Sequence, residues 1–480
     1  MKEIILFGAG NKALWYTRIL STLSVKLLFF ADNNQTRWGE YYCDLLIQRP
    51  DAINNYKNAY ILITCQDENG IKRQLEDMKA GNRLISISEL QKEEVLLSKK
   101  SQKFCSKLLA VPHTENCKWT AVFDNFDGKW GGAEDWVHKV ASEARSDLYE
   151  TCIYERAGQP RQKEDVERMI IRINSAEESE DEAFQLTRLL YEKMPFILVN
   201  NWGTALIRSA ALLKTYFPDK VKIITIMHND YTALYEQQTI WQEEVDLFFC
   251  VSSQILNKLQ KIYHIPAHKT LYHANFTEID HELSREYARQ KEAIRIGYTG
   301  RLEVYQKRTD LLERLIRGLE DTNVLYELNI AGSGEYEDPL KNFVKKNGLE
   351  EKVHFCGQLL KDKMPLFYEK QDIYINISDF EGMSLSMLEA MSCGCVPVVT
   401  NVSGVNDLVK NKKNGLIFEC GDIEGMVKGI CYLDQHRSML KQWGEKSRET
   451  VQEECDSHRY IEYFKTVLRH YSASKIGVNL

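Results

Sequence analysis

The chain has 480 residues, enough for about three domains. Hydrophobic residues make up 44% of it and charged residues 27%, with 9 Pro and 26 Gly, and this composition excludes collagen-like, coiled-coil and disordered proteins. The 62 Lys and Arg residues against 69 Asp and Glu residues leave a net charge of −7. No nucleic-acid partner is expected, because a protein that coats nucleic acid needs an excess of basic residues.

The N-terminus and the cysteines indicate a cytoplasmic protein. The chain opens with the strand-like run Ile4-Ile5-Leu6-Phe7 and without a signal-peptide pattern, and no uncharged apolar stretch reaches about 18 residues. The 12 cysteines are scattered and form no Cys-x-x-Cys pair. This favours reduced, mostly buried thiols over a disulfide framework or a zinc site.

Short apolar strands alternate with helical segments in three blocks, a pattern that predicts parallel α/β layers. The blocks are 1–95, 118–290 and 291–455, with a basic linker at 96–117 and a C-terminal helix within 456–480. The expected strands are 4–7, 26–30, 60–64 and 83–87 in the first block, 119–123, 196–200, 221–227 and 247–251 in the second, and 294–298, 325–331, 353–355, 373–377, 396–399 and 415–418 in the third.

The first block begins with a glycine-rich loop of the dinucleotide-binding type. Gly8 and Gly10 follow the first strand and precede a helix, and Asp32 ends the next strand. In such loops glycine lets the backbone approach a diphosphate, and the acid binds a ribose. The block is short, has no substrate domain of its own, and resembles small modules attached to enzymes of surface-polysaccharide synthesis. A docking module is preferred, followed by a nucleotide sensor and then by NAD chemistry.

Two charged segments separate or interrupt the blocks. Residues 96–109 carry four lysines and no acid, interleaved with apolar residues at helical spacing. This predicts a linker helix packed between domains, with a membrane-surface contact as the alternative. The run from Glu177 to Glu182 is mostly acidic and is expected to form a solvated loop.

Two elements of the second block are candidates for a functional site. Gly131 and Gly132 lie between its first strand and a helix, and Glu134 falls in the first turn of that helix, where the helix dipole favours a carboxylate. A glycine turn that caps a structural helix is the alternative. His228 follows strand 221–227 at its carboxyl end, where open parallel sheets bind ligands, and a purely structural histidine is the alternative there.

The third block carries the strongest motif, at residues 379–397. Glu381 and Glu389 are separated by seven residues, and the chain between them is expected to turn into a helix that begins near Ser384 and ends at Gly394. The free N-terminus of such a helix offers N–H groups and a positive dipole end to an anion. Taken alone, the motif is also compatible with an acidic loop before an ordinary helix.

Cations and glycines follow two other strands of the same block. Gly300 and Arg301 come directly after the strand at 294–298, and Lys307 lies six residues beyond Arg301. The planar fork of Arg and the point charge of Lys suit a diphosphate, and two surface cations are the alternative. Gly332 and Gly334 follow the strand at 325–331, where they either admit a ligand close to the backbone or form a tight turn.

Together these pieces resemble the donor domain of the family 4 retaining glycosyltransferases. That family has the GT-B fold, in which two Rossmann-like domains face a cleft, and here a third small Rossmann-like domain would precede them. The resemblance covers about residues 294–427 well and the second block more loosely. The matching segments are Gly300-Arg301-Leu302 with Lys307, Ala331-Gly332-Ser333-Gly334, residues 353–357, Glu381-Gly382 with Glu389, and Gly394 with Pro397.

The resemblance implies roles for individual residues. Arg301 and Lys307 hold the donor diphosphate, Glu389 binds the ribose hydroxyls, Glu381 contacts the transferred sugar, and His228 faces it. Gly131, Gly132 and Glu134 occupy the acceptor side of the cleft, and residues 355–359 line the base pocket, with uridine, guanosine and adenosine all open. The N–H groups that cradle the diphosphate are those of Gly382, Met383, Ser384 and Leu385.

The resemblance also implies retention at the anomeric carbon. No two aspartates in the chain are separated by a single residue, so the Asp-x-Asp metal clamp of the other glycosyltransferase fold is missing, and neither a metal nor another cofactor is expected. Fixed charges in a poorly hydrated site can stabilise the leaving diphosphate instead. No acid is placed as an obvious covalent nucleophile, which favours a front-face route over a glycosyl-enzyme on Glu381.

The expected function is transfer of a sugar from a nucleotide-diphosphate sugar to a hydroxyl of a glycan, lipid-linked or polyol-phosphate acceptor. By family analogy, we expect this reaction to belong to cell-surface polysaccharide synthesis. The protein would then act in the cytoplasm, in peripheral contact with the inner face of the membrane. Three alternatives stay open: a GT-B sugar-nucleotide epimerase, an NAD-dependent enzyme that uses the first block, and a non-catalytic sugar-nucleotide sensor.

Overall fold

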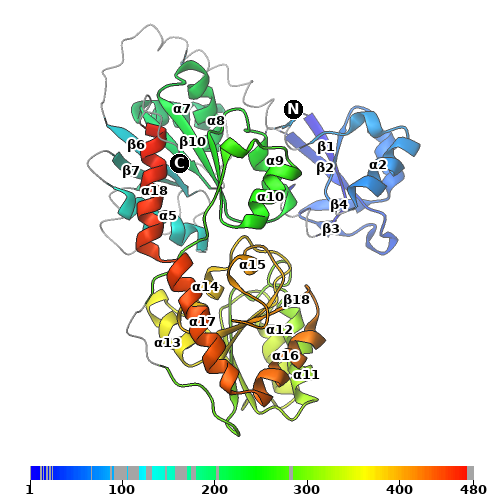
Figure 1. Cartoon of the computed structure of the whole chain (residues 1–480). Coiled ribbons are helices and arrows are strands. Elements are labelled where there is room, and N and C mark those ends of the chain that lie inside the picture. The colour runs from blue at the N-terminus through cyan, green and yellow to red at the C-terminus, as the bar shows by residue number, and fades with distance from the viewer. Residues whose placement is uncertain are drawn as a thin grey trace. The chain divides into compact units, whose positions relative to one another are not determined.

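The computed structural model contains three sheets of mainly parallel strands (Figure 1). The residues it describes are 2–10, 13, 16–17, 20, 23, 25–65, 67–86, 89–90, 105, 118–125, 132–145, 149–156, 170–173, 180–201, 205–279 and 285–472. The predicted linker helix lies outside them, apart from Cys105, and so does Gly131. Among the described residues, no helix is both long enough and apolar enough to cross a bilayer.

The first sheet, blue in Figure 1, has the order β3-β4-β2-β1-β5. Its strands are β1 (Lys2–Phe7), β2 (Val25–Ala31), β3 (Tyr41–Tyr42), β4 (Leu45–Gln48) and β5 (Tyr60–Ile63). Its helices are α2 (Glu68–Asp77) and the 3₁₀ turns η1 (Gln35–Arg37), η2 (Pro50–Asn55) and η3 (Gly81–Arg83). Apolar residues such as Ile5, Phe7, Phe29 and Ile61 form its core, which agrees with the apolar runs that predicted β1, β2 and β5.

Two expectations for this block were wrong. The predicted strand at 83–87 is the turn η3 followed by one isolated bridge between Leu84 and Ile61, where the Arg83 side chain donates to the Tyr56 carbonyl at 2.6 Å. A hairpin of β3 and β4 was also missed. Its turn residues Cys43 and Asp44 have φ of 48° and 61°, a type I′ geometry that Asn-Gly usually signals.

The second sheet has the order β12-β11-β10-β9-β6-β7-β8. Its strands are β6 (Trp119–Asn125), β7 (Tyr149–Arg156), β8 (Ile170–Ile173), β9 (Phe196–Asn200), β10 (Val221–Met227), β11 (Leu247–Cys250) and β12 (Thr270–Tyr272). Its helices are α5 (Gly132–Ala144), α7 (Glu180–Glu192), α8 (Ala205–Tyr216), α9 (Thr232–Thr239) and α10 (Ser253–Lys261), with the 3₁₀ turn η4 (Ala267–Lys269).

The buried strands of this sheet were predicted and its outer strands were not. Strands β9 and β10 have the expected bounds because they are continuous apolar runs. Strand β7 was missed because charged residues interrupt its apolar ones. The prediction of an acidic loop at 177–182 was wrong in part, because residues 180–182 form the first turn of α7. Carboxylates are favourable there because they interact with the positive end of the helix dipole.

The third sheet has the order β15-β14-β13-β16-β17-β18, and all of its pairs are parallel. Its strands are β13 (Ile294–Thr299), β14 (Tyr326–Ala331), β15 (Val353–Gly357), β16 (Ile373–Asn376), β17 (Val396–Thr400) and β18 (Leu416–Phe418). Its helices are α11 (Asp310–Glu320), α12 (Glu337–Lys346), α13 (Met364–Glu369), α14 (Leu385–Ser392), α15 (Val405–Leu408), α16 (Ile423–Gln435) and α17 (Ser438–Glu454), with the 3₁₀ turn η5 (Lys361–Lys363). All six strands begin within one residue of the predicted positions.

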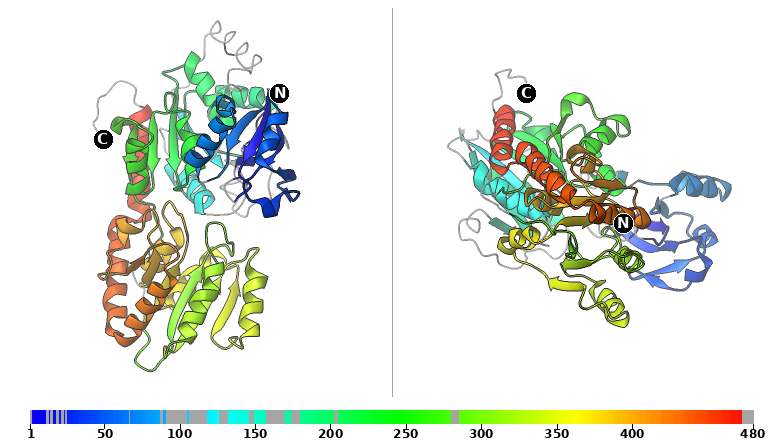
Figure 2. Two further views of the ribbon diagram at one scale, coloured as in Figure 1. Left: turned by 90° about the vertical axis from the view of Figure 1, so that its right-hand side faces the viewer. Right: turned by 60° about the horizontal axis from the view of Figure 1, so that its bottom comes forward.

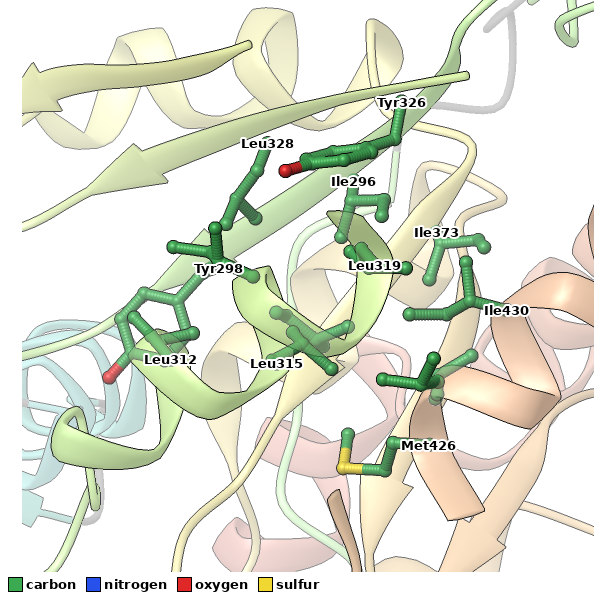
Figure 3. Close-up of a cluster of buried hydrophobic side chains, with 14 of the residues drawn as sticks. Ile296, Tyr298, Leu312, Leu315, Leu319, Tyr326, Leu328, Ile373, Met426 and Ile430 are labelled. Carbon is green, nitrogen blue, oxygen red and sulfur yellow. The ribbon is translucent and has the colours of Figure 1, made fainter. Parts of the chain in front are cut away.

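Helices cover the two faces of this sheet. Helix α11 packs beside α12 and α16, while α14 packs beside α13 and α17. In the left view of Figure 2, α17 in orange and α11 in green lie on opposite sides of the sheet. In Figure 3, buried side chains of α11, such as Leu312, Leu315 and Leu319, point toward Ile296 and Ile430. This core fixes α11 firmly on the sheet.

The chain divides into two compact units. One comprises Met1–Thr225, Thr232–Leu247 and His470–Leu480, and the other comprises Ile226–Tyr231 and Phe248–Arg469. The last helix is α18 (Ser457–Ser472), which confirms the predicted C-terminal helix. Its Tyr460 and Phe464 pack on Phe249 of β11, with ring centroids 6.2 and 5.6 Å away.

Candidate active site

The bend between β16 and α14 forms the centre of the candidate site. Ser384 is the N-cap of α14, and its hydroxyl accepts from the Met387 N–H at 3.3 Å, as a serine at this position is suited to do. The helix ends before Gly394, whose φ of 76° is the left-handed geometry of a C-terminal glycine. Both predicted ends of this helix are confirmed.

The bend exposes backbone donors that the chain does not use. Among the described residues, none accepts a hydrogen bond from the N–H groups of Gly382, Met383, Ser384 and Leu385. All four groups precede the first complete turn of α14, where the helix dipole is positive. The bend therefore has the elements of an anion site.

The tip of β10 packs directly against this bend. A Cβ atom on Gly382 would lie 1.9 Å from the His228 carbonyl oxygen and 2.9 Å from the Asn229 Cα, so only glycine permits this approach. His228 is partly buried, and burial lowers the pKa of its imidazole to about 3. The structure thus brings the backbone of His228 to the bend, and the imidazole of this residue is neutral at physiological pH.

Glu381 and Lys307 form a buried ion pair beside the bend. Lys307 Nζ lies 2.6 Å from Glu381 Oε1, and the two side chains are 15% and 8% exposed. The Ser378 hydroxyl donates to the same oxygen at 2.8 Å, and Gln306 Nε2 donates to the other carboxylate oxygen at 3.2 Å. A buried carboxylate held by three donors has a fixed position and charge.

Arg301 joins this cluster through Gln306. Its Nη2 donates to Gln306 Oε1 at 2.8 Å and lies 3.0 Å from Glu303 Oε1, while its side chain remains 60% exposed. Sequence reasoning missed Gln306, which is buried and bonded on both sides. Its position between the two predicted cations, one residue before Lys307, is the signal that could have found it.

Gly332 and Gly334 bring two loops together. A Cβ atom on Gly332 would lie 1.9 Å from the Gly300 carbonyl oxygen, and one on Gly334 would lie 2.3 Å from that of Leu302. The Leu302 N–H also donates to the Ser333 carbonyl at 2.9 Å. These glycines therefore hold the loop that carries Arg301 by close backbone packing. Of the two interpretations given for them, this agrees with the tight turn and not with close approach of a ligand.

Glu389 lies one turn inside α14 and is half-buried. Its Oε2 accepts from the Tyr368 hydroxyl at 3.3 Å, and that hydroxyl lies 2.8 Å from Thr299 Oγ1. Burial raises the pKa of Tyr368 well above its usual value, so its hydroxyl stays protonated and can donate.

The acceptor-side candidates lie on α5. Gly132 is its first residue and is exposed, and Glu134 in its first turn is 9% exposed. These residues belong to the first compact unit, whereas Arg301, Lys307 and Glu381 belong to the second. Within the residues described, no group of three or more His, Cys, Asp or Glu side chains is arranged to hold a metal ion.

In the first block, Asp32 and the loop at Gly8 are bonded to each other. The Ala9 N–H donates to Asp32 Oδ2 at 2.7 Å, and the Asn34 N–H donates to Oδ1 at 2.8 Å. A Cβ atom on Gly8 would lie 2.6 Å from the Cys65 Cβ, whereas one on Gly10 would meet no atom within 4 Å. The Asp32 carboxylate, which would have to bind the ribose of a dinucleotide, is thus hydrogen-bonded to the chain's own backbone.

Two family models match parts of the chain. Residues 280–450 match the family described as glycosyl transferases group 1, and residues 1–85 match the family described as C2185-like, N-terminal. The first match contains all the residues of the bend and its cations, and the second covers the first sheet.

Several curated relatives are glycosyltransferases. An uncharacterized glycosyltransferase of Haemophilus influenzae is 37% identical over 144 residues, which cover 30% of this chain and 40% of the relative. N-acetyl-alpha-D-glucosaminyl L-malate synthase of Bacillus anthracis is 22% identical, covering 54% and 70%. Poly(ribitol-phosphate) alpha-N-acetylglucosaminyltransferase of Staphylococcus aureus is 27% identical, covering 39% and 37%. The chain thus spans less than half the length of two of these three relatives.

Solved structures show the same fold. The lipopolysaccharide outer core galactosyltransferase WaaB is matched with a TM-score of 0.59 and 18% identity, over 73% of this chain and 99% of that one. Sucrose-phosphate synthase from Thermosynechococcus elongatus is matched with a TM-score of 0.61 and 14% identity, over 75% and 100%. These likenesses confirm the expected fold class, an α/β protein of the GT-B type with an additional N-terminal sheet.

Proposed function

We propose that this chain is a retaining glycosyltransferase that moves a sugar from a nucleotide-diphosphate sugar to an acceptor hydroxyl without a metal ion. The observation that carries the proposal is the buried Glu381–Lys307 pair beside the four open N–H groups of the bend. In this proposal, residues 291–455 form the donor domain, residues 118–290 the acceptor-side domain, and residues 1–95 an appended module.

The leaving diphosphate is stabilised by fixed positive groups. These groups are the N–H groups at the start of α14 and the side chains of Lys307 and Arg301. Lys307 contacts the bend directly, and Arg301 is connected to it through Gln306. Each well-placed donor of this kind contributes about 3 kcal/mol to lowering the barrier. Fixed charges need no reorganisation as the sugar–phosphate bond breaks.

The sugar and the ribose are held by the two glutamates. Glu381 accepts from a hydroxyl of the transferred sugar, next to the carbon that reacts, and Glu389 accepts from the ribose hydroxyls. Neutral His228 is able both to donate and to accept at the sugar. Retention follows a front-face route, because Glu381 is already bonded to three donors and makes a poor nucleophile.

The relatives suggest the class of acceptor. Their names include a poly(ribitol-phosphate) N-acetylglucosaminyltransferase, a galactosyltransferase that acts on a diphosphoundecaprenol-linked sugar, and a lipopolysaccharide core mannosyltransferase. We infer that this chain likewise extends a glycan, lipid-linked or polyol-phosphate acceptor of the cell surface, in the cytoplasm and in peripheral contact with the membrane.

Nucleoside diphosphates and their sugars provide the test. The full chain is titrated with UDP, GDP and ADP by calorimetry, and the sugar forms of the best ligand are then assayed for transfer and hydrolysis with and without EDTA. Arg301→Ala is the main variant, because the Arg301 side chain is itself 60% exposed. Activity and binding are expected to fall at least tenfold in this variant and to be insensitive to EDTA.

The control is Lys341→Gln, which removes a cation of the same domain that pairs with Glu337 on the surface of α12. Failure of all three nucleotides to bind, or full activity of Arg301→Ala, contradicts the proposal. Tight binding without transfer or hydrolysis identifies a sensor instead, and conversion of the donor without an acceptor identifies an epimerase. A covalent glycosyl-enzyme trapped on Glu381 overturns the front-face route alone.

A further inference from the structure

Two short segments of the second unit are paired residue by residue. The Asp379 N–H donates to the Gln306 carbonyl at 2.9 Å, and Gln306 Nε2 donates to the Phe380 carbonyl at 3.1 Å. Lys307 then pairs with Glu381. Residues 306–308 therefore clamp residues 379–381, and two of the three clamping side chains are already part of the candidate site.

The third clamping side chain is that of Arg308. Its Nη1 donates to both carboxylate oxygens of Asp379, at 2.9 and 3.2 Å. Its Nε and Nη2 donate side by side to the two oxygens of Asp310, at 3.1 and 3.0 Å. One guanidinium thus joins two carboxylates, a geometry that Lys cannot reproduce.

Arg308 occupies an unfavourable backbone position. Its φ is 50°, in the left-handed region that glycine enters freely and other residues enter at a cost. Such a backbone conformation persists where the surrounding contacts hold the residue in place. The two ion pairs are the contacts that this side chain makes.

The other end of the clamp is rigid. Asp310 is the first residue of α11, and the next residues, Leu311 and Leu312, are buried in the core of the third sheet. The guanidinium therefore ties the Asp379 turn to a fixed helix. Asp379 is two residues before Glu381, so its position determines where the Glu381 backbone lies.

We propose that Arg308 is a positioning residue, which holds the turn at 379–381 against the start of α11 and so keeps Glu381 in place for the donor sugar. This inference rests on the proposed function for its catalytic consequence. Arg308 does not contact the donor; it acts through Asp379. Without it, the turn keeps the Lys307 and Gln306 contacts but gains freedom at Asp379.

Two variants test the inference from both ends of the pair. Arg308→Gly removes the guanidinium and also relieves the left-handed strain, so the loss of the ion pairs and the relief of strain oppose each other in stability. We expect its melting temperature to stay within about 2 °C of wild type. Asp379→Asn removes the same contact without changing residue 308.

Kinetics distinguish positioning from binding. Both variants are expected to lower kcat about tenfold, while the Kd of the nucleoside diphosphate changes less than about twofold, because Arg301, Lys307 and the bend are intact. The double variant is expected to lose no more than Arg308→Gly alone, since that variant already removes the ion pair with Asp379. The control is Lys352→Gln, which removes an ion pair with Glu320 at the far end of α11 and is expected to leave kcat unchanged.

Hydrogen exchange provides a readout that does not depend on activity. The Asp379 N–H, which is bonded to the Gln306 carbonyl, is expected to exchange about tenfold faster in both variants and at the wild-type rate in Lys352→Gln. Unchanged exchange overturns the inference whether or not the protein transfers sugar. A kcat within twofold of wild type, or a parallel loss of kcat and nucleotide affinity, overturns it in a protein that is active. A wild-type protein that binds no nucleotide overturns the proposed function and leaves the exchange result to decide the clamp.

Discussion

The turns after β1 and after β16 have a similar local design, and their described residues differ in how they are hydrogen-bonded. Each joins a parallel strand to a helix through a glycine-containing turn. After β1, the Ala9 N–H is bonded to Asp32, the Ala9 carbonyl accepts from Arg37 at 2.6 Å, and the Gly8 carbonyl accepts from Thr64 at 2.6 Å. After β16, four successive N–H groups have no acceptor among the described residues, and an ion pair lies next to them.

This difference shows what a glycine motif does and does not determine. The spacing of glycines specifies a turn that can approach a ligand, but the same N–H groups can also bond to the protein itself. Only where they stay open, near a cation, is an anion site left. This difference supports our proposal that the turn after β16, and not the turn after β1, binds the donor.

The largest contrast is expected between alanine substitutions at Gly382 and Gly10. Gly382→Ala places a methyl group against the His228 carbonyl, so the bend must shift, at a cost of about 1–3 kcal/mol in stability and about 100-fold in kcat/KM. Gly10→Ala meets open space and should leave both unchanged. Urea unfolding and donor turnover measure the two effects.

The comparison fails if Gly10→Ala abolishes turnover while Gly382→Ala is tolerated. That result would favour the NAD-dependent interpretation, in which the loop after β1 performs the chemistry. Loss of stability in Gly382→Ala without loss of transfer would show instead that the bend is structural.

Asp32→Ala is the next test, directed at the paired turn. The change leaves the N–H groups of Ala9 and Asn34 without their carboxylate, and unpaired donors of this kind cost about 2 kcal/mol. We expect a lower unfolding midpoint for the first block and unchanged kcat/KM for sugar transfer. Intrinsic fluorescence during urea unfolding and the transfer assay separate the two.

NADH titration of the full chain complements this variant. If Asp32 serves the backbone, neither wild type nor variant should bind NADH measurably. Binding that is lost in Asp32→Ala would show that the carboxylate is available to a ribose after all.

The sequence predicted the donor side well because its strands and its helix are locally encoded. Strands β13 and β16 are rich in buried apolar and aromatic residues, and the ends of α14 are set by Ser384 and Gly394. The role of Arg308 could not be predicted, because its partner Asp379 is 71 residues away and a positive φ at an arginine has no sequence signal. The bonding of Asp32 to the Ala9 N–H likewise depends on how β1 and β2 pair.

A pH-dependent effect is expected from His228, which has no counterpart beside the turn after β1. Its pKa is lowered from the usual 6.5 to about 3 by burial, so the unfolded chain binds the extra proton between these values. The contribution of the neutral imidazole to the free energy of unfolding is therefore fully present above about pH 6.5 and is lost as the pH falls toward 3. At pH 5.5 the loss is about 1 kcal/mol.

His228→Gln should remove this part of the pH dependence. The comparison to make is the change in the free energy of unfolding between pH 7.5 and 5.5, which is expected to be about 1 kcal/mol smaller in the variant than in wild type. Equal changes in the two proteins would mean that the imidazole is not held neutral beside the bend.

The smallest effect is expected from Thr64→Val, which keeps the shape of a buried side chain and removes its hydroxyl. That hydroxyl donates to the Gly8 carbonyl at 2.6 Å and lies 3.1 Å from that of Phe7, so its loss should cost about 1 kcal/mol or less. Transfer activity should not change, because these bonds hold a turn that takes no part in it. A loss of kcat with little loss of stability would show that the turn after β1 is coupled to the donor site, and the distinction between scaffold and site would then no longer hold.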